Sequence, residues 1–433
     1  MPYDLLLRGA TLIDPSQGVC EIRDVAIAGN QIAAVAQVIE APARETIDLS
    51  GKLLTPGWID LHSHVYEGVT TWGIKADALC LSTGVTTIVD AGSAGWANFL
   101  GFKDSVVDTY RTRVLAFVHL SGIGLTYGPV GEMQDLRYAD PERTAFVVQR
   151  WPEVCVGIKL RMGEFQIGEN GLVPLRLARV AAELVDTRLM VHISRGISVP
   201  DILRELRAGD IVTHCYTTGR SASGRNADGN DGLIIGPAGL VLPDVWQARR
   251  RGILFDLGHG RTSFDYAVAK RALTQGFRAD VLSTDLHARS FERTVSSMPE
   301  TASKLLNLGV ELPEIIRQVT TAPAAAIGRS QDLGTVKPGR VADLAAFDIL
   351  EGQFEFRDGH GNRETGSRML RPLLTVRAGA VYRPAELQEE VADARRRARE
   401  MDALSRRDFA ALCGPSHALS ARRQPTGKPP TAA

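Results

Sequence analysis

Two histidines separated by a single residue end a short apolar run in the sequence GWIDLHSH (57–64). If this run forms a β-strand, side chains two residues apart point to the same face, so His62 and His64 can both reach one ion. Imidazole nitrogens bind zinc and other transition metals. The pair is weak evidence by itself, because many such pairs hold no metal.

Four other ionisable side chains stand near the ends of further apolar runs: Lys159 in CVGIKLRM, His192 in RLMVHIS, His214 in DIVTHCY and Asp285 in ADVLSTDLH. A single buried histidine is more often structural than a ligand. Lys159 is different, because a lysine with apolar neighbours in a strand rarely lacks a partner. Together with the histidine pair, these residues predict one joint metal-binding site.

The apolar runs also predict the scaffold that must position these side chains. Eight runs recur between residues 55 and 330, and most are separated by stretches with helical spacing, such as PLRLARVAAELVD. This alternation indicates an α/β fold with a parallel sheet covered by helices, and eight units favour a closed (β/α)8 TIM-like barrel. Such barrels carry their active sites at the C-terminal ends of the strands, where the candidate ligands lie. The runs are 57–64, 86–92, 113–121, 155–162, 188–194, 210–216, 252–260 and 279–287.

The two ends of the chain differ from this middle part. Residues 1–54 and 331–385 contain short strand-like stretches separated by Gly, Asn and Pro, and we expect them to build one small β-sandwich beside a barrel over 55–330. Residues 386–433 predict a charged helix followed by a flexible tail. The Gly-rich segment 217–239 follows the sixth run, and it is either a lid or substrate loop or a disordered surface insertion.

Bulk composition narrows the class of protein. The 433 residues carry 50 basic and 50 acidic side chains, so neither nucleic acid nor a membrane surface is expected as a partner. The five cysteines contain no CxxC pair, and a sparse, odd set favours a reducing compartment. No secretory signal or membrane span is evident in the sequence. We therefore expect a cytoplasmic enzyme, a homo-oligomer, that acts on a small molecule.

The motifs resemble a known group of enzymes. PGWIDLHSH, the lysine in VGIKLR, the two later histidines and the acid in STDLH are similar to the amidohydrolase superfamily in its binuclear form. DLLLRGATLID and GTVKPGRVADLAAFD are similar to the small sandwich of dihydroorotases, hydantoinases and N-acyl-D-amino acid deacylases. GIKLR, FDLGHG, STDLH and MPETASKLLNLG most resemble the amidohydrolase/deacetylase group, whose members are often labelled dihydroorotase-like.

The resemblance implies a specific metal chemistry. Lys159 would carry a CO2-derived carbamate (N6-carboxylysine), which turns a cation into an anion that can bridge two divalent metal ions. His62, His64 and Asp285 would hold the more buried ion, and His192 and His214 the more exposed one. Nitrogen and oxygen ligands suit zinc, while manganese, iron and cobalt stay open. The ions would activate a shared water for attack on a carbonyl, with Asp285 as the catalytic proton shuttle.

Several further residues are candidates for substrate binding. Arg161 shares the strand face of the predicted carbamate and could bind a substrate carboxylate, although a surface or supporting role is equally open. His259, His287 and Tyr127 are weaker candidates, because structural roles are at least as common for such residues. Arg220 and Arg225 in the 217–239 segment could replace Arg161. His119 ends the third run and is left out of the ligand set.

Three functions fit this pattern. The first is a hydrolase that releases an acyl group, expected to be acetyl, from an amide or ester of a small carboxylic acid. The second is a cyclic amidase of the dihydroorotase or hydantoinase type. The third is a scaffold that has lost its metals, and the intact set of ligand positions argues against it. The motifs around GIKLR and FDLGHG favour the first.

Overall fold

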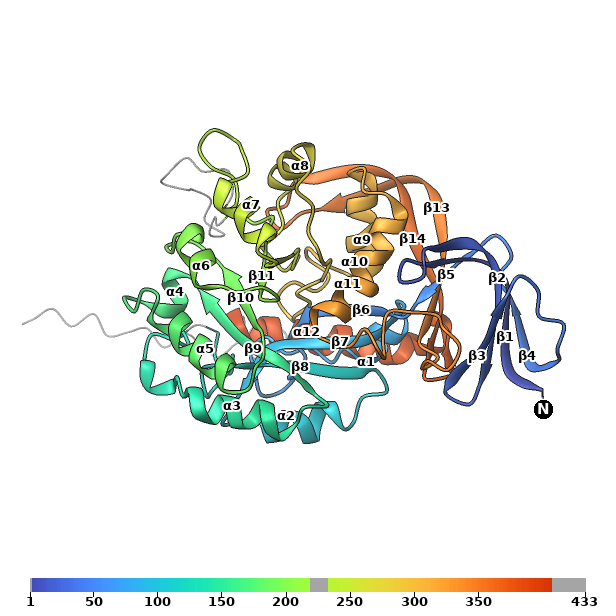
Figure 1. The fold of residues 1–433 in the computed structure, drawn as a ribbon, viewed down its shortest axis with the longest axis horizontal. Helices are drawn as coiled ribbons and strands as arrows, with labels where there is room; N and C mark the ends of the chain where they lie inside the picture. Colours follow the sequence, from blue (N-terminus) through green and yellow to red (C-terminus); the bar gives the residue numbers. More distant parts are fainter. Residues whose placement is uncertain (1, 129, 219–232, 407–433) are drawn as a thin grey trace, which may run out of the picture.

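The fold consists of two β-sheets and a set of covering helices (Figure 1). In this computed structural model, residues 2–128, 130–218 and 233–406 are described. The larger part is a curled parallel sheet with helices outside it, and the second sheet lies beside it near the N-terminus. No helix among the described residues is long and apolar enough to cross a membrane.

The curled sheet has seven parallel strands whose spatial order follows the sequence. Its strands are almost wholly buried and rich in Val, Ile and Leu, as expected for a sheet covered by helices. Seven of the predicted strands and the TIM-like character are thereby confirmed. The strands are β6 (Trp58–Ser63), β7 (Val85–Gly95), β8 (Arg113–His119), β9 (Cys155–Met162), β10 (Leu189–Ile193), β11 (Ile211–Thr213) and β12 (Leu254–Asp256).

The eighth predicted run lies between the two edge strands but is not a regular strand. It makes single parallel bridges, Asp256 to Val281 on one side and Ser63 to Leu286 on the other. A side chain replaces one of the backbone hydrogen bonds that would pair this run with a neighbouring strand, because Asp60 Oδ1 accepts a hydrogen bond from the backbone N–H of Thr284 at 3.0 Å. Asp285 then has a φ of 47°, which takes the chain out of the extended conformation.

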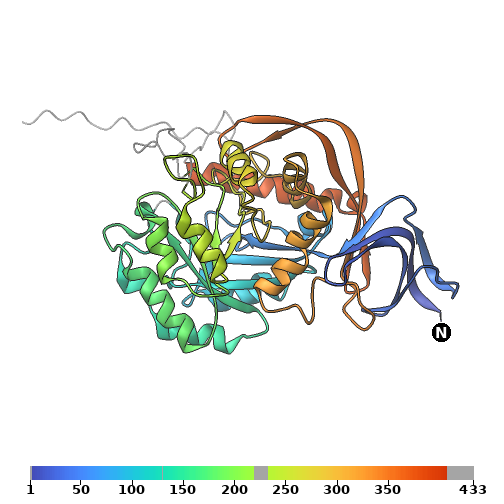
Figure 2. The ribbon, with the colours of Figure 1, turned by 45° about the horizontal axis from the view of Figure 1, so that its top comes forward.

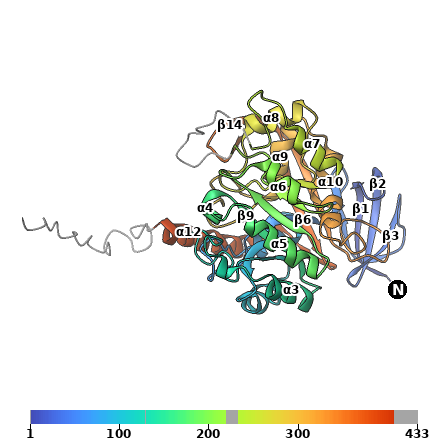
Figure 3. The same ribbon diagram turned by 60° about the vertical axis from the view of Figure 1, so that its left-hand side comes forward.

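Helices cover the outer face of the curled sheet (Figure 3). In α5, the buried residues Leu175, Ala178, Ala181 and Ala182 recur at helical spacing and pack toward β9 and β10. The helical elements are α1 (Asp77–Leu81), α2 (Phe99–Phe102), η1 (Lys103–Val107), η2 (Leu136–Tyr138), α3 (Pro141–Arg150), α4 (Glu164–Ile167), α5 (Val173–Leu184), α6 (Val199–Glu205), α7 (Pro243–Arg250), α8 (Tyr266–Thr274), α9 (Met298–Asn307), α10 (Leu312–Val319) and α11 (Thr321–Ala326).

The second sheet combines strands from both ends of the chain. It has eight strands in the order β15-β14-β13-β5-β1-β2-β3, with β4 paired to β1. This single sheet joins the ends as expected, but it does not confirm the sandwich, and the domain boundaries stay a prediction. The strands are β1 (Tyr3–Asp14), β2 (Val19–Ala28), β3 (Gln31–Ala36), β4 (Ala43–Asp48), β5 (Leu53–Pro56), β13 (Leu344–Arg357), β14 (Arg363–Arg377) and β15 (Ala380–Tyr382).

The long hairpin β13–β14 links the two sheets. It arches from the second sheet over the helices of the first (Figure 2). Gly359 N donates to Phe264 O at 2.8 Å, and Asn307 Nδ2 donates to Arg368 O at 2.7 Å. The extent of this hairpin was not predicted from the sequence, because EGQFEFRDG contains only two apolar side chains, Phe354 and Phe356.

After η3 (Pro384–Leu387), the predicted charged helix is present as α12 (Gln388–Arg406). Arg395 and Arg399 pair with Glu292, and Arg397 pairs with Glu67 at 3.2 Å. The helix therefore lies against loops that follow β6 and the eighth run. The predicted tail, residues 407–433, lies outside the described part of the chain.

Candidate active site

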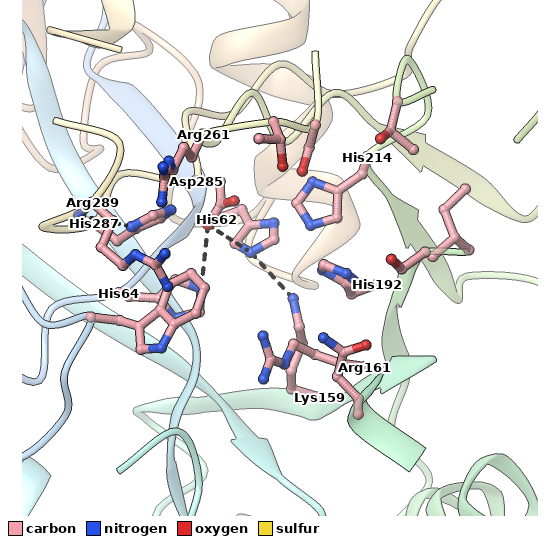
Figure 4. Close-up of a pocket in the computed structure, with 17 residues that line it drawn as sticks. His62, His64, Lys159, Arg161, His192, His214, Arg261, Asp285, His287 and Arg289 are labelled. Carbon is pink, nitrogen blue, oxygen red and sulfur yellow. Dashed lines mark hydrogen bonds and ion pairs between the residues drawn. The ribbon is translucent and has the colours of Figure 1, made fainter. Parts of the chain in front are cut away.

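A cavity of about 260 Å³ opens at the C-terminal ends of the parallel strands (Figure 4). All the predicted metal ligands line it, together with Arg161 and His287. Thr217, from the start of the predicted loop, also lines it, whereas 219–232, with Arg220 and Arg225, lie outside the described residues. The lining residues are His62, His64, Trp72, Lys159, Arg161, Gln166, His192, Ile193, Ser194, His214, Thr217, Arg261, Thr262, Ser263, Asp285, His287 and Arg289.

His62, His64 and Asp285 form a tight cluster. Asp285 Oδ1 lies 3.3 Å from His64 Nε2 and 3.5 Å from His62 Nε2. One ligand atom from each residue lies within 4.8 Å of the others, which a single ion could bridge. His64 follows β6 rather than lying within it, and Asp285 follows the bridge at Val281, so strand ends and loops together build the cluster.

Hydrogen bonds set the tautomers of two imidazoles. Thr213 Oγ1 donates to Asp256 Oδ2 at 2.7 Å, so it accepts from His62 Nδ1 at 2.8 Å. His214 Nδ1 donates to the carbonyl of Gly258 at 2.7 Å. In a neutral imidazole, a hydrogen on Nδ1 leaves a lone pair on Nε2, the form that binds metals. Both rings are therefore prepared as Nε2 ligands.

Lys159 lies fully buried among these imidazoles. Its exposed fraction is 0%, and its Nζ lies 3.2 Å from His62 Nε2 and 3.6 Å from Met190 Sδ. Burial lowers the pKa of the amine to about 7, against the pull of Asp285. A substantial fraction of the amine is therefore uncharged near neutral pH, and the uncharged form is the one whose lone pair can react with CO2.

His192 completes the ring of donors. Its imidazole packs edge-on against His214 with centroids 4.3 Å apart, and it forms no hydrogen bond with another described residue. Burial, followed by the neighbouring His214, holds its pKa well below the ordinary value. A neutral ring with an open nitrogen beside a second prepared imidazole suits metal binding. His214 itself lies just after β11, with a φ of 74°.

The donor set fits divalent metal ions. Asp285 Oδ1 is buried and accepts no hydrogen bond from any described residue, which is costly unless a cation satisfies it. Burial keeps the four imidazoles neutral, since their pKa values are all lowered. Nitrogen and oxygen donors without thiolate are the ligands of catalytic zinc and related ions.

Arg161 lines the cavity but already has a carboxylate partner. Glu132 accepts from Arg161 Nε at 2.7 Å and from Nη2 at 2.6 Å, and both side chains are buried. The pKa of Glu132 is lowered to about 2, since Arg161 and His119 outweigh its burial. The pair leaves Nη1 of Arg161 as the guanidinium nitrogen without a partner among the described residues. His119 Nε2 lies 3.4 Å from Glu132 Oε1, and His119 does not line the cavity.

Trp72 and His287 together form one part of the cavity wall. The Trp72 ring contacts His287 at 4.7 Å between centroids, and the guanidinium carbons of Arg161 and Arg289 lie 5.5 and 5.3 Å from its centre. His287 Nδ1 accepts from the backbone of Arg289 at 3.1 Å, so Nε2 carries the ring hydrogen. Burial lowers the pKa of His287 to about 3, which keeps it a neutral donor.

Two predicted substrate contacts do not reach the cavity. His259 is fully buried, and both ring nitrogens are bonded, to Lys304 Nζ at 3.0 Å and to Gly260 O at 3.0 Å. Tyr127 is 49% exposed and is not among the lining residues. Neither residue lines the cavity, so this geometry gives no support to direct substrate binding by His259 or Tyr127, which stays a prediction.

Sequence reasoning also missed residues that support the site. Glu132 and Trp72 lie in loops with no periodic pattern, so no sequence signal identified them. Thr213 and Asp256, which orient His62, lie in buried strands, where a polar residue is itself a signal that could have been used.

Comparisons with known proteins show which family the chain is similar to. Residues 250–368 match the amidohydrolase family. A deacetylase from Enterococcus faecalis is 34% identical over 387 residues, which cover 88% of this chain and 100% of that protein. A deacetylase from Agrobacterium fabrum is 33% identical, with coverage of 82% and 85%.

Solved structures show the same likeness. A structure described as an adenine deaminase superposes with a TM-score of 0.79 at 33% identity, covering 88% of this chain and all of that one. A structure described as a dihydroorotase gives 0.77 at 30% identity, covering 88% and 99%. From these likenesses, the chain belongs to the amidohydrolase superfamily and is a hydrolase that acts on C–N bonds.

Proposed function

We propose that this protein is a binuclear metal-dependent deacetylase, which removes an acetyl group from an amide or ester of a small carboxylic acid. One observation carries the proposal: Lys159 is fully buried in a ring of metal-ligand side chains, with its Nζ 3.2 Å from His62 Nε2. An ammonium group is out of place there, whereas an anion formed from the amine would complement two cations.

The modification of Lys159 is a simple addition. The lone pair of the neutral amine attacks the carbon of CO2 and forms an N–C bond, while one C=O π bond of CO2 breaks and its electron pair goes to oxygen. One N–H proton then leaves to solvent. The product is a carbamate anion. His62, His64 and Asp285 would hold one metal ion, His192 and His214 the other, and the carbamate would bridge them. Bound divalent ions would supply a water of lowered pKa and an electrophile for the carbonyl oxygen.

Asp285 is the residue placed to move a proton. Its carboxylate lines the cavity beside His62 and His64, and it is the one acid among the described lining residues. It takes a proton from the attacking water and transfers it to the leaving nitrogen or oxygen.

The cavity residues that are not metal ligands would bind the carboxylate of the substrate. Arg161 presents a guanidinium held by Glu132, and Nη1 can donate to a substrate carboxylate. The neutral His287 can donate from Nε2 to a carbonyl or carboxylate oxygen. Arg261 and Arg289 add positive charge to the same cavity, which favours an anionic substrate.

Deacetylation is favoured over ring opening because the relatives named above, from E. faecalis and A. fabrum, are both deacetylases and cover most of the chain. A cyclic amidase of the dihydroorotase type is the second candidate, supported by the superposed structure with that description. The same ligand set serves both reactions, so the ligands do not distinguish the two.

A substrate panel tests the choice. Zinc-loaded enzyme is assayed with N-acetyl-D- and N-acetyl-L-amino acids, acetylated hydroxy acids, dihydroorotate and hydantoins, with adenine as a further arm. We expect acetate release from at least one acetylated acid, with kcat/KM well above that for any cyclic amide. Turnover of dihydroorotate or a hydantoin alone would establish the second candidate, and turnover of adenine alone would refute both.

A further inference from the structure

Lys304 is a buried lysine that the proposed mechanism does not use. It lies on α9 with an exposed fraction of 1%, and it does not line the cavity. Its Nζ donates to Thr294 O at 2.7 Å and to His259 Nε2 at 3.0 Å, and it pairs with Glu300 Oε1 at 3.1 Å. An ammonium group has three hydrogens, and these three acceptors account for all of them.

His259 transmits this contact to the backbone. It is fully buried and stacks on Phe264 with ring centroids 4.7 Å apart. Because Nε2 accepts from Lys304, the ring hydrogen lies on Nδ1, which donates to Gly260 O at 3.0 Å. The same carbonyl accepts from Thr294 Oγ1 at 2.9 Å. The carbonyl of Gly260, the last residue of the LGHG motif, therefore accepts hydrogen bonds from both His259 and Thr294.

The held segment, 258–260, touches two of the candidate metal ligands. Gly258 O accepts from His214 Nδ1 at 2.7 Å. Gly260 packs so closely on Asp285 that an added Cβ would lie 2.2 Å from Oδ2. Gly260 N also donates to Thr284 O at 2.9 Å, next to Asp285 in the chain. A shift of this segment would move both ligands at once.

We propose that Lys304 and His259 are positioning residues, which hold segment 258–260 so that His214 and Asp285 keep the geometry that metal binding needs. Neither residue touches the substrate or the reacting atoms. The inference rests on the proposed function, because it takes His214 and Asp285 as metal ligands. It also explains why FDLGHG and the lysine of MPETASK occur in one sequence: the two motifs meet through this pair.

Zinc affinity of the full-length protein tests the inference. Lys304→Met and His259→Leu each remove the bond between the two residues while keeping a buried apolar side chain of similar length. We expect the weaker-bound zinc to dissociate with a Kd raised about 10- to 100-fold in either variant, measured by competition with a chromogenic chelator. Lys270→Met is the matched control, since it removes an ion pair between an exposed lysine and Glu364, at 2.6 Å, that involves no residue of this segment.

Circular dichroism at the assay temperature separates positioning from folding. Folded Lys304→Met and His259→Leu proteins that bind zinc as tightly as the wild type would overturn the inference. So would a loss of affinity shared by Lys270→Met, or a failure of both variants to fold, which would make the pair part of the general core. If Lys304→Met alone fails to fold, the zinc affinity of His259→Leu decides whether the inference holds. Wild-type protein that itself binds fewer than two ions would instead refute the proposed function.

Discussion

The carboxylate of Glu132 accepts two hydrogen bonds from the guanidinium of Arg161, at 2.7 Å from Nε and 2.6 Å from Nη2. Both residues are buried. Arg161 lines the cavity and shares β9 with Lys159, whereas Glu132 lies in the loop before α3. This ion pair affects how Arg161 can contribute to substrate binding. Its charge is largely balanced within the protein, so its contribution to substrate binding lies in the direction of its remaining N–H groups more than in long-range attraction.

Arg161→Met should weaken catalysis selectively. The loss of a charge-assisted pair in a desolvated pocket is expected to lower kcat/KM by about 30- to 1000-fold, or about 2–4 kcal/mol, for substrates with a carboxylate beside the scissile bond. An uncharged acetyl ester should lose much less, because it never used the arginine. Equal losses on both substrates would show that Arg161 supports the metal site instead.

Glu132→Gln should change the response to acid. The pKa of Glu132 is lowered from 4.5 to about 2 in the folded protein, mainly by Arg161. A lowered folded-state pKa adds stability above the unfolded-state value and loses it as the pH falls from about 4.5 toward 2. The free energy of unfolding should therefore be higher for the wild type than for the variant near pH 6, and the two should converge on acidification. A constant difference across this range, measured by urea unfolding, would contradict the ion pair.

Asp285→Asn should separate proton transfer from metal binding. Loss of general acid–base transfer is expected to reduce kcat by about 10²–10⁴. Some zinc should stay bound, because the histidines are unchanged. Steady-state kinetics together with zinc analysis of the same sample provide the test, and near-full activity would reduce Asp285 to a structural acid.

Lys159→Ala should respond to added carboxylic acids. The variant loses the group that would bear the carbamate, so activity should fall, while the space left by the side chain can admit a small carboxylate. We expect formate or acetate to restore part of the activity in the presence of zinc. Lys270→Ala, a surface control, should show no response. Absence of rescue together with retained activity in Lys159→Ala would exclude a bridging role.

The sequence predicted the curled sheet and the ligands for the same reason. Strands in a parallel sheet are continuous apolar runs, so an ionisable residue at the end of such a run is conspicuous, as Lys159 and His192 are. The topology of the sheet then brings the C-terminal ends of the strands together, so the joint site becomes evident only when all the runs are considered. The eighth run was only partly anticipated, because Asp60 bonds the backbone of Thr284 in place of a neighbouring strand, and sequence periodicity does not register such a bond.

The roles of Glu132, Lys304 and His259 could not be predicted from the sequence, because they depend on contacts that only the folded chain makes. Glu132 lies in a loop 29 residues before Arg161, and only the folded chain brings the two together. Lys304 has the spacing of an ordinary helix lysine, so nothing in MPETASKLLN signals that it is buried. For His259 a substrate contact and a structural role were both open, because the end of its run lies near the site; its ring contacts Phe264 and Lys304.

Metal content is the most direct test of the proposed two-metal centre and of the carbamate on Lys159 that would organise it. Protein purified with zinc and bicarbonate, dialysed free of loose metal and analysed by elemental methods, should contain about two equivalents per chain. Lys159→Ala prepared in parallel should contain about one or less. A wild-type content of one equivalent or less, or an unchanged content in the variant, would contradict the account.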